Sequence, residues 1–337
     1  MQLNFCTLFD SNYLSRGLAM YESLNKQCNN FHLYIFCFDN KCYKILETLN
    51  LTHATIISLS DFEDEELLSI KPIRTKTEYC WTSTPFTILY IIKKYSISHC
   101  TYIDADIYFY ASPSPLIEEM NNNSVLITEH RYTPRYDKST LSGKYCVQFV
   151  TFKNDAQGLK VLEWWRSACI KWCYNRHEKG KFGDQKYLDD WPTKFNSIHV
   201  LNHLGGGVAL WNIQQYYFEL QNGKLISTEL KTNKKFELIF YHFHYLRFYQ
   251  NNTIDLGRYI LPTQSRNLIY LPYLQHLEKI KKYIQPIDNS FDPHGPLVYK
   301  KNGRNMIRYI LRKIGQSYNI YNADNLIKLA NSFNPLK

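Results

Sequence analysis

The amino-acid sequence predicts an α/β protein with a large domain over residues 1–250 and a basic, helical extension over residues 251–337. Strand-like and helical segments alternate up to about residue 100, which is typical of a parallel sheet. After residue 110 short strands and helices mix in an α+β manner. From Asn251 onward the chain is rich in Pro, Asn and Lys between short helical stretches, which predicts the extension. With 45% hydrophobic residues among 337, the chain can bury a large core.

The elements follow from apolar periodicity. We expect Ser11 or Asn12 to cap the first helix, the acidic segment 61–66 to open a short helix, and Pro85 to start a helix that runs to Lys94. The predicted strands are residues 3–9, 32–39, 54–59, 124–128, 147–153, 199–201 and 236–243, with a further strand that ends at Asp104, and the other predicted helices are residues 14–27, 41–49 and 156–173.

Two carboxylates, Asp104 and Asp106, end an apolar, strand-forming run. Residues i and i+2 of a strand point to the same face, so both side chains can converge on one cation. Oxygen ligands favour Mg²⁺ or Mn²⁺ over Zn²⁺, and such ions commonly meet substrate phosphates. A lone Asp-x-Asp also occurs by chance about once in a chain this long, so a structural role stays open. The carboxyl end of a strand is where open α/β sheets bind ligands, which favours the metal site.

Two further segments carry candidate binding residues. The run Gly205-Gly206-Gly207 lacks the spacing of a dinucleotide or phosphate loop, and either lets the backbone approach a sugar or forms a turn. If the strand extends over 236–244, His242 and His244 would face the same side. One of them could complete an Asp-Asp-His metal shell, with Arg247 holding a diphosphate, or both could be structural histidines beside an aromatic core.

The net charge of +10 indicates an anionic partner. Residues 300–313 hold six cationic and no acidic side chains, and apolar residues recur there at helical spacing. This basic amphipathic helix, with its flanks at 297–315, either lies on an anionic membrane surface or packs its apolar stripe on the catalytic domain. No zinc-finger, recognition-helix or RNA-binding pattern accompanies the charge, so we expect no nucleic-acid partner. The cationic residues are Lys300, Lys301, Arg304, Arg308, Arg312 and Lys313, and the apolar ones are Met306, Ile307, Ile310, Leu311 and Ile314.

The cysteines and the amino terminus predict the compartment. Nine cysteines, mostly in apolar surroundings and without paired C-x-x-C spacing, indicate reduced thiols. The first residues lack a basic segment followed by an apolar core, so we expect no signal peptide. We expect a cytoplasmic protein, with any membrane contact peripheral and at the inner face of the cytoplasmic membrane.

Four motifs in order resemble the GT-A fold of retaining family 8 glycosyltransferases. They are Thr7-Leu-Phe-Asp10-Ser-Asn-Tyr13, Ile103-Asp104-Ala-Asp106, Gly183-Asp184-Gln185 and His242. The stretches Tyr79-Cys-Trp81-Thr and Phe182 to Trp191 are closer still to a bacterial group of nucleotide-diphospho-sugar transferases. The resemblance spans roughly residues 3–250 and implies a mixed central sheet flanked by helices.

The resemblance implies a role for each matching residue. Thr7, Asp10 and Tyr13 match residues that hold a nucleobase and ribose, usually uridine. Asp104 and Asp106 match the ligands of Mn²⁺ or Mg²⁺, with Asp104 also near the ribose and donor sugar. Asp184 and Gln185 match the pair beside the anomeric carbon of the donor sugar, and His242 matches the late metal ligand, with His244 as its substitute.

Two positions depart from the family pattern. The H-x-x-G-x-x-K tail lacks its glycine and lysine here, so Arg247 is our substitute for the diphosphate clamp. Cys146-Val-Gln148 stands in place of the family's Asn-x-Gly turn, so the donor sugar is not specified. Gly205 and Gly206 remain candidates for donor-sugar contact.

The resemblance therefore implies a metal-dependent transferase that moves a sugar from a UDP-sugar to a hydroxyl of a glycan or lipid-linked glycan, with retention, as in bacterial surface-polysaccharide assembly. Two alternatives stay open. A nucleotidyltransferase would also use paired aspartates, although no Gly-Ser phosphate turn precedes Asp104. A non-catalytic basic module for membranes or nucleic acid would leave Asp104, Asp106 and His242 structural.

Overall fold

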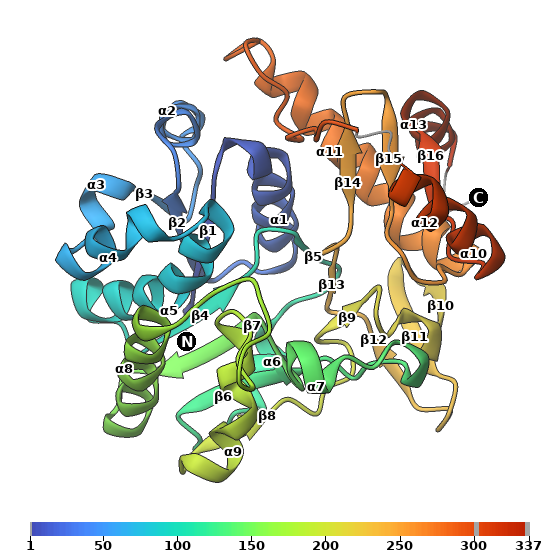
Figure 1. Ribbon diagram of the computed structural model, residues 1–337. Coiled ribbons are helices and arrows are strands. Elements are labelled where there is room, and N and C mark those ends of the chain that lie inside the picture. The colour runs from blue at the N-terminus through green and yellow to red at the C-terminus, as the bar shows by residue number, and fades with distance from the viewer. Residues whose placement is uncertain (1, 300–302, 334–337) are drawn as a thin grey trace.

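The computed structural model describes residues 2–299 and 303–333 (Figure 1). Within these residues, seven strands form a central sheet in the order β3-β2-β1-β4-β7-β6-β8. The first four strands are parallel, whereas β7 runs antiparallel to both β4 and β6. The mixed central sheet flanked by helices is confirmed. Its strands are β1 (Leu3–Phe9), β2 (Phe31–Cys37), β3 (Ala54–Ser58), β4 (His99–Ile103), β6 (Val125–Glu129), β7 (Tyr145–Lys153) and β8 (Ile198–Val200).

Helices cover both faces of this sheet, because side chains along each strand alternate between two apolar clusters. In β1, Phe5 and Phe9 belong to one cluster, and Cys6 and Leu8 belong to the other. The first cluster contains side chains of α1 (Leu14–Gln27) and α2 (Asn40–Leu49), and the second contains side chains of α4 (Glu65–Ile70), α5 (Lys76–Tyr95) and α8 (Ala156–Lys171). Figure 1 shows α8 and α5 on the side of the sheet opposite α1.

The helix that precedes β4 starts earlier than Pro85, so that prediction is wrong. α5 begins at Lys76 because Thr75 and Glu78 form a capping box, in which each side chain accepts a hydrogen bond from the other residue's backbone N–H. Pro85 lies inside the helix and is buried. The φ angle that proline requires is helical, so the residue is tolerated although it removes one hydrogen-bond donor.

Two other helices begin differently from the prediction, one in its cap and one in its division. Ser11 and Asn12 do not cap α1; they form a 3-10 turn (Ser11–Tyr13) before it, and the Asp10 side chain caps that turn by accepting from Asn12 N. The acidic segment 61–66 spans two short helices, α3 (Leu59–Phe62) and α4, which begin at the caps Ser58 and Asp64. In each case the capping residue directly precedes its helix or turn, and its side-chain oxygen accepts from the backbone N–H two or three residues later, as N-terminal caps do.

The strand predicted over 236–243 is two strands in different sheets. β12 (Lys235–Glu237) pairs with β11 (Lys224–Glu229), which also pairs with β10 (Tyr216–Gln221). β13 (Phe240–His242) lies between β5 (Ile107–Phe109) and β9 (Val208–Ala209) in a separate three-stranded sheet. This second pairing places His242 opposite Ile107, directly beside Asp106.

The carboxyl-terminal part contains strands as well as helices. β14 (Arg247–Tyr249), β15 (Thr253–Asp255) and β16 (Ile320–Asn322) form a sheet, and α11 (Leu271–Ile284) packs against α1. A division at residue 250 stays a prediction. Lys300 and Lys301 of the predicted basic helix lie outside the described residues, and α12 begins at Gly303. The remaining helices are α6 (Ser114–Glu118), α7 (Ser139–Ser142), α9 (Trp191–Lys194), α10 (Thr263–Ser265), α12 (Gly303–Ile314) and α13 (Ala323–Ser332).

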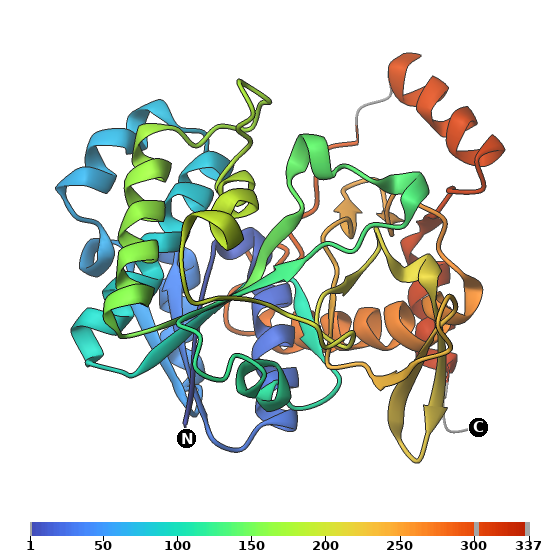
Figure 2. The same ribbon diagram turned by 90° about the horizontal axis from the view of Figure 1, so that it is seen from below.

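Figure 2 shows α12 at the periphery of the molecule, away from the central sheet. Of the helices described, none has the length and apolar character needed to cross a bilayer. All nine cysteines lie in the described part of the chain as free thiols, and all but Cys80 are buried.

Candidate metal and nucleotide site

The paired carboxylates lie in a tight turn between β4 and β5. Ile107 N donates to Asp104 O at 3.3 Å, which closes the turn, and Asp104 N donates to Gln148 O on β7 at 3.1 Å. Phe243 N, just after β13, donates to Asp106 O at 2.9 Å. The backbone thus fixes Asp104, Asp106 and His242 next to one another at the carboxyl end of β4.

The side chains of these three residues converge. His242 Nε2 lies 3.0 Å from Asp106 Oδ1 and 3.6 Å from Asp104 Oδ2. One ligand atom from each residue lies within 4.8 Å of the others, a span that a single divalent ion with bonds of about 2.0–2.6 Å can bridge. The two carboxylates are ligands that Mn²⁺ and Mg²⁺ prefer, and the imidazole is a common ligand of divalent transition metals. The donor set and its spacing therefore fit a divalent cation.

His244 is not part of this cluster. Its ring lies 5.5 Å from the ring of His242, and the Trp211 ring contacts both. β13 ends at His242, so the two histidines do not continue one strand. Of the two histidines considered from the sequence, His242 has the geometry of a ligand, and His244 lines the cavity beside it.

Gln148 orients the imidazole of His242. His242 Nδ1 and Gln148 Oε1 are 2.6 Å apart, and an amide oxygen only accepts hydrogen bonds, so the proton resides on Nδ1. Nε2, which faces Asp104 and Asp106, is then free to act as a metal ligand once it has no proton. The sequence indicated no role for Gln148; only the crossing of β7 behind the turn reveals it.

Burial and mutual charge shift the acidities of the cluster. Burial raises the pKa of Asp104, as does repulsion from Asp106. Burial also raises the pKa of Asp106, but attraction to His242 outweighs burial and lowers the pKa of Asp106 to about 2. Burial disfavours protonated His242, yet Asp106 raises the pKa of His242 well above its usual value. Asp106 and His242 therefore form an ion pair whose proton a bound cation would displace.

A cavity of about 640 Å³ opens over the cluster. Asp10 and Tyr13 line it from the end of β1, and Arg247 lines it from the start of β14. The guanidinium of Arg16 lies 4.6 Å from the centre of the Tyr13 ring and supports it. The structure thus brings predicted nucleotide-binding residues from both ends of the large domain to the metal cluster.

Asp184 and Gln185 line the same cavity at the start of a 3-10 turn (Gln185–Asp190). The indole Nε1 of Trp165, on α8, donates to Asp184 O at 3.0 Å. Gln185 Nε2 donates to Ser142 O at 2.6 Å, which ties the turn to α7. Burial, together with repulsion from Asp104, raises the pKa of Asp184 to about 8. The backbone of Asp184 and the side chain of Gln185 are therefore held in place at the cavity wall.

Three predicted site residues do not line the cavity. Thr7 is fully buried inside β1. Gly205 has no room for a Cβ, which would lie 2.1 Å from Glu237 O, and a Cβ on Gly206 would meet Leu201 and Leu116. This loop needs small residues because it packs tightly against the rest of the protein. Of the two roles considered from the sequence, sugar contact or a turn, the packing agrees with the turn.

Two lysines that the sequence did not single out also line the cavity. Lys76 lies in the first turn of α5, and Lys138 lies just before α7. Neither has a carboxylate within ion-pair distance among residues 2–299 and 303–333. No motif surrounds either lysine, so only the fold shows that they and Arg247 face the acidic cluster.

The fold and the site together define a mixed α/β protein with a carboxylate–imidazole cluster at the carboxyl edge of its sheet. The chain belongs to the family of two Bacillus subtilis (strain 168) proteins, YfnD and YfnF, both called uncharacterized. It is 31% identical to YfnD over 297 residues, which are 86% of this chain and 92% of YfnD. It is 30% identical to YfnF over 298 residues, 86% of this chain and 96% of YfnF. No family model matches the sequence.

Solved structures of glycosyltransferases resemble this one at low sequence identity. Mouse xyloside xylosyltransferase 1 is 12% identical and covers 62% of this chain and 87% of its own, with a TM-score of 0.43. An active-site mutant of LgtC is 10% identical and covers 71% of this chain and 86% of its own, with a TM-score of 0.44. A glycosyltransferase involved in glycosylation of the major capsid of PBCV-1 is 10% identical and covers 72% of this chain and 93% of its own, with a TM-score of 0.40.

Proposed function

We propose that this protein is a metal-dependent glycosyltransferase that moves a sugar from a nucleotide-sugar donor to a hydroxyl of a glycan or lipid-linked glycan. The observation that carries the proposal is the convergence of Asp104, Asp106 and His242 beneath a cavity that Asp184 and Gln185 also line. A Mn²⁺ or Mg²⁺ ion held by the first three residues would supply positive charge to the diphosphate of the donor.

The remaining lining residues have matching chemistry. Asp10 and Tyr13 offer a carboxylate and an aromatic ring to the nucleobase and ribose, which for UDP is a uridine. Lys76, Lys138 and Arg247 offer cations to phosphate oxygens. These groups bind and orient the donor, so its anomeric carbon would face Asp184 and Gln185.

Asp184 and Gln185 are the proposed catalytic residues. Their place in the cavity wall would let the Gln185 amide oxygen, and Asp184 once a nearby bound cation has lowered its raised pKa, steady the positive charge that develops on the donor sugar when its bond to the phosphate breaks. Attack by the acceptor hydroxyl from the same face would give retention. A cytoplasmic role in bacterial surface-polysaccharide assembly is part of the same proposal.

Release of nucleoside diphosphate from a panel of nucleotide-sugars tests this function. We expect release from a UDP-sugar that requires Mn²⁺ or Mg²⁺, is lost in Asp106→Asn, and is kept in Asp190→Asn. Asp190 is an exposed aspartate of the turn after Gln185 and does not line the cavity, so it is a matched control. Full activity of Asp106→Asn with added Mn²⁺, or no release from any donor by the wild type, would contradict the proposal.

A further inference from the structure

Helix α12 presents its apolar side chains to solvent. Each of them is between 51% and 75% exposed, far more than expected for a helix that packs on a core. The sequence left open whether this stripe covers the catalytic domain, and the structure shows that it does not. The stripe consists of Met306, Ile307, Ile310, Leu311 and Ile314.

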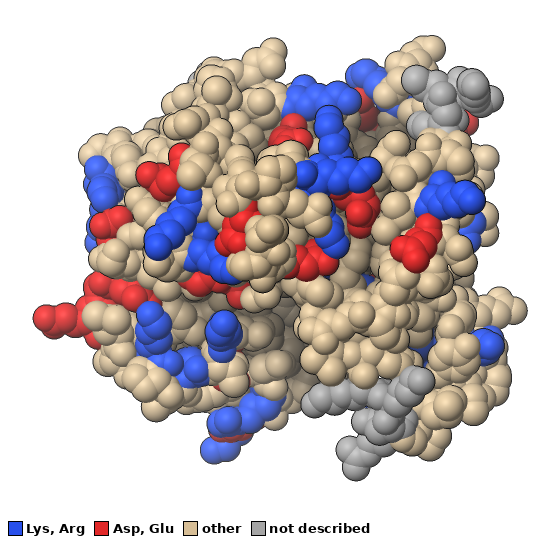
Figure 3. Space-filling model, turned by 90° about the horizontal axis from the view of Figure 1, so that it is seen from above, with Lys and Arg blue, Asp and Glu red and all other residues tan. Residues whose placement is uncertain are grey.

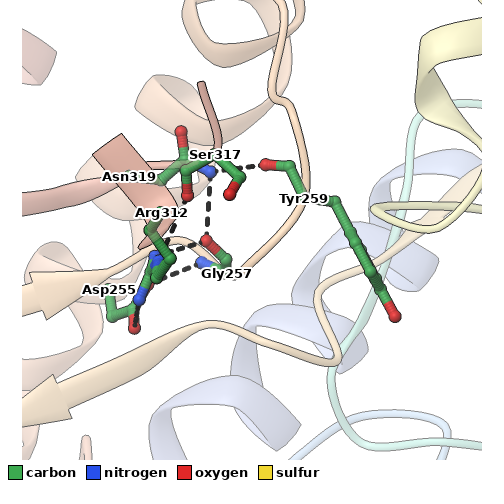
Figure 4. Close-up of polar contacts among 6 residues, drawn as sticks. All are labelled: Asp255, Gly257, Tyr259, Arg312, Ser317 and Asn319. Carbon is green, nitrogen blue, oxygen red and sulfur yellow. Dashed lines mark hydrogen bonds and ion pairs between the residues drawn. The ribbon is translucent and has the colours of Figure 1, made fainter. Parts of the chain in front are cut away.

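The opposite side of α12 is fastened to the protein by Arg312 (Figure 4). Its guanidinium donates to both oxygens of Asp255, at 2.7 and 2.8 Å, and to Gly257 O at 2.6 Å. Successive helical residues are rotated by about 100°, so Arg312 points away from the centre of the apolar stripe. The helix is therefore attached by its polar side and cannot bury its apolar side on the same neighbour.

The attachment is part of a wider polar cluster. Asn319 Nδ2 donates to Gly257 O at 3.0 Å and to Tyr259 O at 2.7 Å. Gly257 has φ of +116°, and a Cβ there would lie 2.1 Å from Leu210 Cδ2, so only glycine fits. Gly257 N also donates to Asp255 Oδ1 at 2.9 Å. Arg312 thus holds α12 to a rigid loop, and Asn319 holds the segment that follows the helix to the same loop.

A groove of about 500 Å³ beside α12 is positively charged. Arg247, Arg258 and Arg308 line it, all three exposed, and none forms an ion pair within the described part of the chain. The acidic residue that lines the groove is Asp255, and Arg312 neutralises it. Leu311 and Arg308 also line the groove, so its mouth adjoins the apolar stripe.

We propose that α12 docks this face of the protein on an anionic lipid surface. The apolar stripe would enter the boundary between headgroups and acyl chains, while Arg308 and Arg258 meet lipid phosphates. A second copy of the chain would also cover the stripe, but it would bring like-charged arginines together, so the charge favours an anionic membrane.

The docking has a consequence for the cavity. Arg247 lines both the groove and the cavity over the metal cluster, so the two are neighbours. A molecule whose phosphate lies in the membrane surface would be presented next to the cavity. Attachment to lipid does not itself depend on the glycosyltransferase proposal, and the two can fail separately.

Vesicle flotation tests the docking with the full-length chain. We expect binding to vesicles of phosphatidylcholine mixed with phosphatidylglycerol and little binding to phosphatidylcholine alone. Ile307→Asp/Ile310→Asp should weaken binding by roughly tenfold or more, because charges would enter the acyl boundary. Ile73→Asp/Leu230→Asp should bind as the wild type, since these residues are 64% and 59% exposed but lie outside α12.

Two further measurements make the outcome decisive. Stabilisation by UDP and Mn²⁺ should persist in Ile307→Asp/Ile310→Asp, which shows that the variant is folded and that its cavity is intact. Sedimentation should show a monomer for the wild type without lipid. Equal lipid binding by wild type and Ile307→Asp/Ile310→Asp, no binding of the wild type to anionic vesicles, or a dimer that this variant disrupts would overturn the proposal.

Discussion

Among the residues that do not bind the metal directly, Gln148 should have the largest effect on the metal affinity of the site. It fixes the proton of His242 on Nδ1 and so leaves Nε2 facing the carboxylates. In Gln148→Leu the imidazole loses that acceptor, and we expect Mn²⁺ affinity to fall by roughly 10- to 100-fold, as for other groups that orient metal-binding histidines. Titration calorimetry with Mn²⁺ measures the change directly.

The conservative variant Gln148→Glu keeps an acceptor at the same place and should retain Mn²⁺ affinity. If Gln148→Leu bound Mn²⁺ as tightly as the wild type, His242 would not be a ligand, or its orientation would not depend on β7.

His130 should make the fold sensitive to acid. Burial is the main cause that lowers the pKa of His130 to about 3, and its Nδ1 lies 3.2 Å from Lys144 O. The unfolded chain protonates this histidine near its usual pKa of about 6.5, so its contribution to stability is complete above that pH and is lost as the pH falls below it. Between pH 7 and pH 5 the loss is about 2 kcal/mol.

Urea denaturation of wild type and His130→Asn at the two pH values isolates this effect. The wild type should lose about 2 kcal/mol more than the variant, because groups other than His130 titrate in both. An equal loss in both proteins would mean that His130 is accessible to protons in the folded state.

The sequence predicted those site residues that stand close together in the chain and have side chains suited to the site. Asp104 and Asp106 are two residues apart at a strand end, and Asp184 and Gln185 are adjacent, so each pair reaches the cavity as a unit. Gln148 and Lys138 act only through residues far away in the chain, and no local pattern marks them. Thr7 and the glycines at 205 and 206 matched a pattern, but packing holds them outside the cavity.

At the scale of elements, α12 depends on the Arg312–Asp255 pair. Asp255 is buried, so removing its cation leaves a carboxylate without compensation. Arg312→Met should destabilise the protein by about 3 kcal/mol in urea denaturation. Arg308→Met, which removes an exposed arginine from the same helix, should cost less than about 0.5 kcal/mol. Similar losses in both variants would show that the pair does not hold α12 in place.

Helices and strands were predictable where the residues at their ends form a recognisable local sequence pattern. β1 and α1 have the predicted bounds because apolar periodicity changes abruptly at each end. The start of α5 was misplaced because the capping box at Thr75 competes with the stronger pattern of a proline at a helix start. The division of 236–243 into β12 and β13 depends on pairing with strands far away in sequence, which no local pattern shows.

For the whole molecule, the positive net charge is not gathered into one field. Figure 3 shows Lys and Arg side chains interspersed with Asp and Glu over the face seen from above. The cavity over the Asp104–Asp106–His242 cluster and the groove beside α12 are each lined by three cations that form no ion pair in the described part of the chain. This distribution fits two local anionic ligands, a diphosphate and a lipid headgroup, better than a long polyanion.

The proposed catalytic site depends on one architecture, in which the ends of β1 and β4 meet β13 at a single edge. The order of strands in the central sheet brings Asp10 and Asp104 together, and the small β5-β13-β9 sheet adds His242. Sequence alternation predicted the parallel part of the central sheet, whereas the small sheet could not be predicted, because β13 pairs with β5 more than 130 residues earlier in the chain.

The most direct test of the central claim is the thermal stability of the protein with UDP, with and without Mn²⁺. A ligand that binds only the folded state raises the melting temperature. We predict a marked rise when UDP and Mn²⁺ are present together, little rise with UDP alone, and no joint effect in Asp106→Asn. An equal rise in Asp106→Asn, or a rise with UDP that does not depend on metal, would contradict a metal–diphosphate site at Asp104, Asp106 and His242.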